Sequence, residues 1–357
     1  MRLRPALLGG LVPMVAIAVA VALGTWASAL GSDPRPSLGV ALDVLPRATL
    51  VAGFTDWASI RDDLGLGDAS TADDRAALTD KASLRDLTTR SVLGGVVTEM
   101  HEVYGWSAAD LDWESYGRSP QGAAMVARFA PDVSIDEVER RLVDLGYRRE
   151  GEVWTLTASA SSTVGPELAA TLGHLAIVPG RRLVVAADRP AYVSAVLATI
   201  SGDDPSALSV RAIADVARQL AGYDTAVVQA GAFGCRATSV DRLGTDVQDQ
   251  ADAAVARAGR LTTPTFTGRG LVERSADRQD ISFVAAFDSP AEASEQARVR
   301  AALATGPFIG RSGRVEDSLD LTAATSEGSV ATLRFDLDPD VAAYMSGEGP
   351  LLFASCP

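Results

Sequence analysis

The chain has 357 residues, of which 47% are hydrophobic and 22% charged, and its formal net charge is −14. The hydrophobic content is ample for packed cores, and the length suits one large domain or two smaller ones. The acidity argues against nucleic acid as a partner, because binding a polyanion depends on Lys and Arg side chains that neutralise phosphates. The negative electrostatic field of such an acidic chain also disfavours docking on anionic lipid headgroups.

An uncharged and largely apolar run occupies residues 6–30. Its length suits a transmembrane helix, which must cross a hydrocarbon core of about 30 Å. Arg2 and Arg4 precede the run, and the first charge after it is Asp33. The positive-inside rule therefore places residues 1–5 in the cytoplasm and everything after the run outside it.

Two fates of this segment stay open. Ala27, Ser28 and Ala29 have the small-x-small form of a signal-peptidase site, and cleavage there would give a secreted protein. The apolar run is longer than a usual signal core, which favours a retained single-pass anchor in the cell membrane. Residues 31–47 are predicted to be a proline-containing linker, followed by an extracytoplasmic body at 48–357. Without Arg2 and Arg4, 30 basic and 46 acidic residues remain, which gives a net charge of −16 (30 − 46).

Cys235 and Cys356 are the only cysteines, and both lie in the part predicted to be exported. An oxidising compartment makes their pairing reasonable, so the sequence predicts a disulfide between them. Two separate buried thiols are the alternative.

The body repeats one pattern, in which an apolar strand leads into a capped helix that stops at a glycine. The four copies of the strand begin at Val51, Val126, Leu183 and Val284. The helix after the second strand is the best specified, since Ser134 and Glu137 fit a capping box and Gly146 supplies a left-handed stop. The shared order of strand, cap, helix and glycine predicts an internal duplication, without the regular spacing of a solenoid.

Further elements follow from periodicity and turn residues. Residues 71–113 are predicted to be mostly helical, and 240–260 to form another helix. Residues 315–323 and 330–337 read as a hairpin. These elements indicate the α+β class: an N-terminal transmembrane or signal helix, then repeated strand–helix units that form antiparallel sheets covered by helices on one side. A division into two subdomains near 160–175 is left open.

The motifs that could carry chemistry fail when tested individually. His101 begins a zinc-protease pattern, but Gly105 stands where the second ligand belongs. His174 has no Gly-x-Ser-x-Gly elbow to serve, and Lys81 follows neither a Ser-x-x-Lys serine nor a phosphate-binding glycine loop. Each histidine is interpreted as an ordinary, partly buried side chain.

Asp336, Asp338 and Asp340 imitate the start of a calcium loop, but Val341 replaces the turning glycine. We interpret the three aspartates as a hairpin end and a helix cap. The sequence thus predicts no catalytic, cofactor-binding or metal-ligating residue and no cofactor. A pair of catalytic carboxylates leaves no linear signature, so this one class of enzyme stays open.

The densest feature of the sequence is the aromatic segment at residues 104–117. Ser107 is predicted to cap a helix on which Trp106 and Trp113 lie on similar sides. One interpretation is that these rings anchor the core, since aromatic side chains bury large areas. The other is an exposed binding surface for a glycan or a protein. That surface would consist of Tyr104, Trp106, Trp113 and Tyr116.

Several segments resemble a family of actinobacterial membrane-anchored or secreted proteins that has no established activity. The likeness covers most of the body. It rests on Gly105-Trp106-Ser107 with the following Asp112-Trp113-Glu114, on Phe54-Thr55-Asp56-Trp57, on Leu145-Gly146-Tyr147 and on the closing Leu352-Phe353-Ala354-Ser355-Cys356. The resemblance implies a single-pass envelope protein and implies no catalytic residue.

The sequence therefore favours a non-catalytic protein of the cell envelope, with its N-terminus inside and its body outside. Its expected partner is an envelope protein or a glycan, with membrane contact through the N-terminal helix alone and no nucleic acid. The competing hypothesis is a carboxylate-dependent hydrolase that acts on cell-wall glycan.

Overall fold

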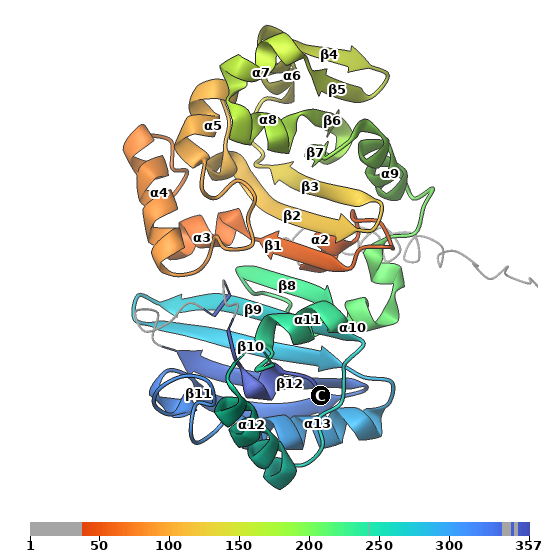
Figure 1. The fold of residues 1–357 in the computed structure, drawn as a ribbon. Coiled ribbons are helices and arrows are strands. Elements are labelled where there is room, and N and C mark those ends of the chain that lie inside the picture. Colours follow the sequence, from red (N-terminus) through yellow and green to blue (C-terminus); the bar gives the residue numbers. More distant parts are fainter. Residues whose placement is uncertain (1–37, 242, 338–343, 346–348) are drawn as a thin grey trace, which may run out of the picture. The chain divides into compact units, whose positions relative to one another are not determined.

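The computed structural model describes residues 38–357 except 242, 338–343 and 346–348 (Figure 1). The segment predicted to enter the membrane lies outside the described residues, so the anchor remains a prediction. In the described part, no helix is both long and apolar enough to cross a membrane. The described residues group into one compact unit. Strands from before and after residues 160–175 belong to the same sheet.

One antiparallel sheet of twelve strands organises the body and confirms the α+β class. Its strand order is β11-β12-β10-β9-β8-β1-β2-β3-β7-β6-β5-β4. The strands are β1 (Val51–Thr55), β2 (Leu111–Ser119), β3 (Gly122–Phe129), β4 (Tyr147–Glu150), β5 (Val153–Leu156), β6 (His174–Val178), β7 (Leu183–Ala187), β8 (Thr225–Ala230), β9 (Phe266–Ser275), β10 (Arg278–Ala286), β11 (Asp320–Glu327) and β12 (Val330–Leu337).

The sheet consists of two groups of strands with similar connectivity, β1–β7 and β8–β12. Each group begins with one strand, continues through helices to a hairpin, and then through another helix to strands that return beside that hairpin. The hairpins are β2–β3 and β9–β10, and the last strand of each group, β7 or β12, pairs with the second hairpin strand. The first group contains β4 and β5 in addition. Each of the four strands predicted to repeat, β1, β3, β7 and β10, does lead into a helix, whereas the two groups repeat a larger unit that the sequence did not predict.

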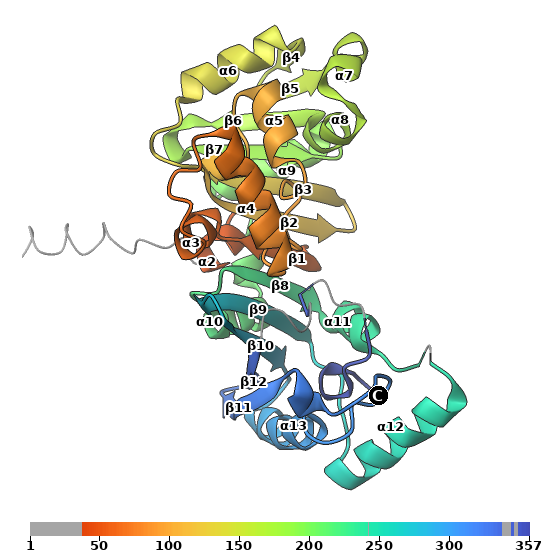
Figure 2. The same cartoon turned by 90° about the vertical axis from the view of Figure 1, so that its left-hand side faces the viewer.

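Helices cover both faces of the sheet, so the expectation of cover on one side is wrong (Figures 1 and 2). Successive residues of the central strands are apolar, and both faces therefore need to be buried. In β8, Val227 packs with one core cluster, and Ala226 and Val228 pack with the other. The first cluster includes residues of α3 (Trp57–Asp63), α4 (Ala72–Leu84), α5 (Val97–Tyr104), α6 (Ile135–Asp144), α7 (Ala158–Val164), α8 (Pro166–Leu172), α12 (Thr245–Ala258) and α13 (Pro290–Leu303). The second includes residues of α2 (Leu38–Leu42), α9 (Pro190–Ser201) and α10 (Arg211–Gln219).

Most predicted helix ends are confirmed. The hydroxyl of Ser134 accepts a hydrogen bond from the backbone of Glu137 and starts α6, and Ser289 does the same for α13. Gly202 ends α9 with a left-handed backbone. The predicted C-terminal hairpin is present as β11–β12, although β11 begins only at Asp320 because Val315–Asp317 form a turn of 3-10 helix.

Two predictions of local structure need correction. The predicted linker at 31–47 is in part core, because residues 38–42 form α2 and the side chains of Leu38, Leu42 and Leu45 are buried. The prolines of this segment indicate a linker, but its apolar residues form a face that packs on the sheet. The predicted helical region at 71–113 contains α4 and α5 but ends in β2.

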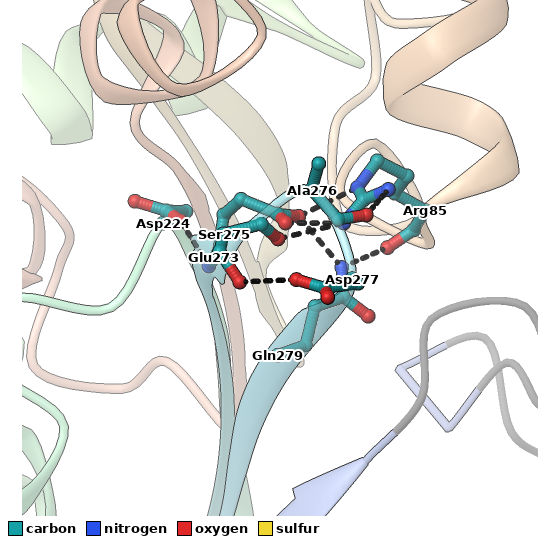
Figure 3. A network of polar contacts seen from close by, with 7 residues as sticks. All are labelled: Arg85, Asp224, Glu273, Ser275, Ala276, Asp277 and Gln279. Atoms are coloured by element: carbon teal, nitrogen blue, oxygen red, sulfur yellow. Dashed lines mark hydrogen bonds and ion pairs between the residues drawn. The ribbon is translucent and has the colours of Figure 1, made fainter.

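A polar network connects the two groups of strands (Figure 3). The guanidinium of Arg85, at the end of α4, forms an ion pair with the carboxylate of Glu273 on β9 and donates to the carbonyls of Ser275 and Ala276. The side-chain amide of Gln279 donates back to the carbonyl of Arg85 and to Glu273. This network joins α4 to the β9–β10 hairpin. Because Glu273 is buried, solvent screens its ion pair with Arg85 only weakly.

We predict that Glu273→Ala lowers the free energy of unfolding by about 2–4 kcal/mol, because it leaves the Arg85 guanidinium half-buried without its carboxylate. Arg274→Ala is the matched control on the same strand, since Arg274 pairs with Asp280 from a more exposed position. Its expected cost is about 1 kcal/mol or less. Urea denaturation of the full-length chain measures both, and equal losses would contradict a special role for the network.

The disulfide between Cys235 and Cys356 is present, as predicted. It joins α11 (Gly231–Thr238) to the C-terminal segment across a sequence separation of 121 residues. The Cα atoms of the two cysteines lie 5.2 Å apart, which fits ordinary disulfide geometry.

Removing the crosslink with Cys235→Ala and Cys356→Ala is expected to cost about 5 kcal/mol in the chain-entropy model, because the closed loop is long. The free energy of unfolding is measured with and without a reducing agent. The reductant should destabilise the wild-type chain and leave the double variant unchanged. Free thiols in the denatured, unreduced wild-type chain would show that the bond does not form.

Candidate functional site

The predicted aromatic surface is largely inside the protein. Tyr104, Trp106 and Trp113 are only 1–2% exposed, so these three residues form no exposed patch. Ser107 caps one turn of 3-10 helix, and Trp113 lies in β2 rather than on the same helix as Trp106. The two tryptophans belong to different core clusters on opposite faces of the sheet. Only Tyr116 is partly exposed.

The buried rings make specific packing contacts. The ring of Trp106 meets that of Phe129 edge to face, with centroids 4.8 Å apart. The hydroxyls of Tyr104 and Tyr147 lie 2.6 Å apart, and burial raises the pKa of Tyr104 to about 12. The interpretation of this segment as a core anchor therefore holds for three of its four aromatic residues.

The residues tested for chemistry do not come together. His101 lies 3.4 Å from a carboxylate oxygen of Asp110, and His174 lies 3.2 Å from the hydroxyl of Thr155. Lys81 is exposed on α4. Asp336 lies near the end of β12, and Asp338 and Asp340 lie outside the described residues. Across the described ranges, no group of three or more potential ligands could hold a metal ion.

Glu114 on β2 is a buried carboxylate that sequence reasoning did not single out. It accepts hydrogen bonds from the indole of Trp57, the hydroxyl of Ser91 and the backbone of Val92. Burial raises its pKa, and the hydrogen bonds oppose that shift. Because its oxygens are occupied and the side chain is 1% exposed, it fastens the loop around Ser91 to the sheet and is not placed to meet a substrate.

The strongest candidate for a functional site is a groove near the C-terminal end of β2. It has a volume of about 480 Å³ and is bounded by β1, β2, β8, α11 and the C-terminal segment. The described residues that line it are Val51, Tyr116, Arg118, Gln229, Phe233, Arg236, Ala237, Ser239, Leu243, Gly349 and Pro350. Its size is that of a pocket for a small molecule.

The floor of the groove is a row across three strands. In the register of the sheet, Val51 on β1 pairs with Arg118 on β2 and with Gln229 on β8. Tyr116 points to the same face as Arg118, because side chains two positions apart share a face of a strand. The intervening Gly117 faces the other way, where a side chain would collide with Leu45.

One wall of the groove is α11. Phe233, Arg236 and Ala237 share one side of this helix through their spacing of three and four residues. The guanidinium carbon of Arg236 lies 5.9 Å from the ring centre of Phe233, within the range of a cation–π contact. Phe233 is 39% exposed and is the one aromatic residue among the exposed large hydrophobic side chains that the structure describes.

Two glycines set α11 close to the sheet. A Cβ atom on Gly231 would lie 1.8 Å from the carbonyl oxygen of Pro264, and one on Gly234 would lie 2.0 Å from the hydroxyl of Thr267. Real side chains do not tolerate such distances, so glycine is required at both positions. Because these two residues have no side chain, α11 can lie close to the sheet, and this sets the position of the groove wall.

The C-terminal segment completes the rim and is bound to α11. The backbone nitrogens of Gly349 and Leu351 donate to the carbonyls of Ala237 and Thr238, at 3.3 and 3.2 Å. The disulfide adds a covalent connection at the neighbouring Cys235. Both cysteines line a smaller hollow of about 240 Å³, which shares Arg236 and Ser239 with the groove. The disulfide therefore holds two sides of the rim together.

The charge of the groove contrasts with that of the chain. Arg118 and Arg236 line it, and the described lining residues include no Asp or Glu. Neither arginine forms an ion pair or a side-chain hydrogen bond with another described residue, although Asp241 lies in the adjacent hollow with Arg236. The groove is thus a local cationic site in a chain of net charge −14.

Of the residues that line this groove, only Tyr116 was predicted from the sequence to belong to a binding surface. The available signal was the alternation of Tyr116 and Arg118 along one strand. α11 itself was not predicted, since its two glycines disfavour a helix. No local pattern shows that α11 and β2 line one groove, because more than a hundred residues separate them.

Comparison with known proteins adds little. No protein-family model and no curated protein matches the chain. Two crystal forms of TP0453 match the chain, at 8% and 7% identity and TM-scores of 0.41 and 0.40. Each comparison covers 84% of this chain and 94% of the other. At this level the likeness carries no inference about function.

We predict that Phe233→Ala changes the free energy of unfolding by about 1 kcal/mol or less, because this ring is exposed beside the groove. Trp106→Ala should cost about 3–5 kcal/mol, since it opens a cavity in the core. Chemical denaturation of the two variants measures the difference. A large loss for Phe233→Ala would assign that ring to the core and remove it from the site.

Proposed function

We propose that this chain is a non-catalytic binding protein of the cell envelope that holds an envelope component in the groove between β2 and α11. The observation that carries this proposal is a groove lined by arginine and aromatic side chains in a strongly acidic chain. Ligand sites typically combine aromatic side chains with a few polar or charged groups that orient the ligand.

The composition of the groove supports binding without catalysis. Among its described lining residues there is no His, Cys, Asp or Glu, and Tyr116 and Ser239 carry the only hydroxyls. General acid–base chemistry needs a group that gains or loses a proton near neutral pH. A hydroxyl without a neighbouring base is a weak nucleophile.

The location outside the cytoplasm rests on two observations. The apolar N-terminal run with preceding arginines favours a single-pass anchor with the N-terminus inside, and secretion after cleavage is the alternative. The disulfide fits either outcome, because such bonds persist mainly in oxidising compartments.

A carboxylate-dependent hydrolase of wall glycan is the competing proposal. The best place for it is a hollow of about 500 Å³ that contains Asp280 and Glu327. Arg274 donates to Asp280 over 2.6 Å, and the side-chain amide of Gln219 donates to Glu327 over 2.8 Å. Because one oxygen of each carboxylate already has a partner, this hollow ranks below the groove.

The test is to identify what the full-length chain retains. The chain is purified from a bacterial envelope, and its bound small molecules are extracted and compared by mass spectrometry with those of the Phe233→Asp, Arg236→Glu variant. We expect a compound that the wild-type chain retains unchanged and the variant loses, because the substitutions add negative charge to the groove and remove its exposed ring.

Arg334→Glu is the control, since Arg334 lies in the hollow that contains Asp280. It should retain the same compound as the wild-type chain. Identical extracts from the wild-type chain and the groove variant would refute binding in the groove. Turnover of wall glycan that depends on Asp280 and Glu327 would favour the hydrolase.

A further inference from the structure

The geometry points to one ligand class for the groove: a small amphipathic anion, with an apolar body and one or two negative charges. This step rests on the proposed function, because it specifies the chemistry of the ligand that the same groove would hold. Three features carry it, namely the two arginines from different elements, the apolar residues of the lining and the size of the site.

The two arginines that line the groove come from different elements. Arg118 lies at the end of β2 in the floor, and Arg236 lies on α11 in the wall. A guanidinium presents a planar fork of donors that matches carboxylate, phosphate and sulfonate oxygens. An anion between them would gain charged hydrogen bonds that no described residue now makes with either side chain.

The groove also has apolar lining residues beside its arginines. The ring of Phe233, the side chain of Val51 and those of Leu243 and Pro350 line it together with Tyr116. A free inorganic anion would leave this surface in contact with water. A ligand with an aromatic or acyl body covers it and gains the hydrophobic contribution as well.

Size and charge exclude larger partners. A volume of about 480 Å³ fits a single drug-sized molecule. Two arginines can neutralise only one or two charges, and the body around them carries an excess of acidic residues. A polyanion would therefore meet repulsion beyond the groove.

A matched pair of fluorescent probes tests the ligand class. The anionic probe is 8-anilinonaphthalene-1-sulfonate, and the neutral probe is N-phenyl-1-naphthylamine, which has the same rings without the sulfonate. Both are titrated into the full-length chain in one detergent, and the signal of the detergent alone is subtracted. We expect Arg118→Gln and Arg236→Gln each to weaken binding of the anionic probe about tenfold.

The same substitutions should leave the affinity for the neutral probe unchanged within a factor of about two, whereas Phe233→Ala should weaken binding of both probes. Arg334→Gln controls for the hollow that contains Asp280 and should affect neither probe. The melting temperature of each variant is measured, so that binding to a partly unfolded chain is recognised.

The outcomes separate the two proposals. If Phe233→Ala weakens both probes but the arginine substitutions do not weaken the anionic one, the groove binds ligands and the anionic class is wrong. If no groove substitution affects either probe, both the ligand class and binding in the groove are wrong.

Discussion

The antiparallel pairing of β1 with β8 is the constraint on which the rest of the structure depends. Five residue pairs connect the two groups of strands into one sheet. At the end of this pairing lies Asp224, whose buried carboxylate accepts from the hydroxyl of Ser59 in the first group and from the backbone of Glu273 in the second. A buried carboxylate needs such partners, so the junction specifies how the groups meet.

Buried charged side chains hold the irregular segments in the same way. The Arg300 guanidinium donates to the carbonyls of Phe353, Ser355 and Thr262, and thereby fastens the C-terminal segment to α13. Burial lowers the pKa of Arg300 to about 10, which leaves it protonated at neutral pH. Glu114 in the same way holds the loop around Ser91 in the first group of strands. In both cases one buried side chain satisfies several polar groups that would otherwise be buried without partners.

The groove is a consequence of these constraints. Pairing of β1 with β8 brings Val51 and Arg118 beside Gln229, and the two glycines of α11 let that helix approach closely enough to form a wall. The C-terminal segment then completes the rim because the disulfide and Arg300 hold it there. The site is therefore assembled from three distant parts of the chain on a rigid sheet, an arrangement that preorganises the lining side chains.

The sequence alone determined the features that depend on near neighbours: the α+β class, the capped helices after β3 and β10, the C-terminal hairpin and the pairing of the only two cysteines. Periodicity and capping act over a few residues, so they can be read locally. The tertiary structure decided which apolar residues are core, as the burial of α2 and of the aromatic segment shows. It alone placed Phe233 and Arg236 in the same groove as Arg118, because strand order and the approach of α11 follow from packing between residues far apart in the chain.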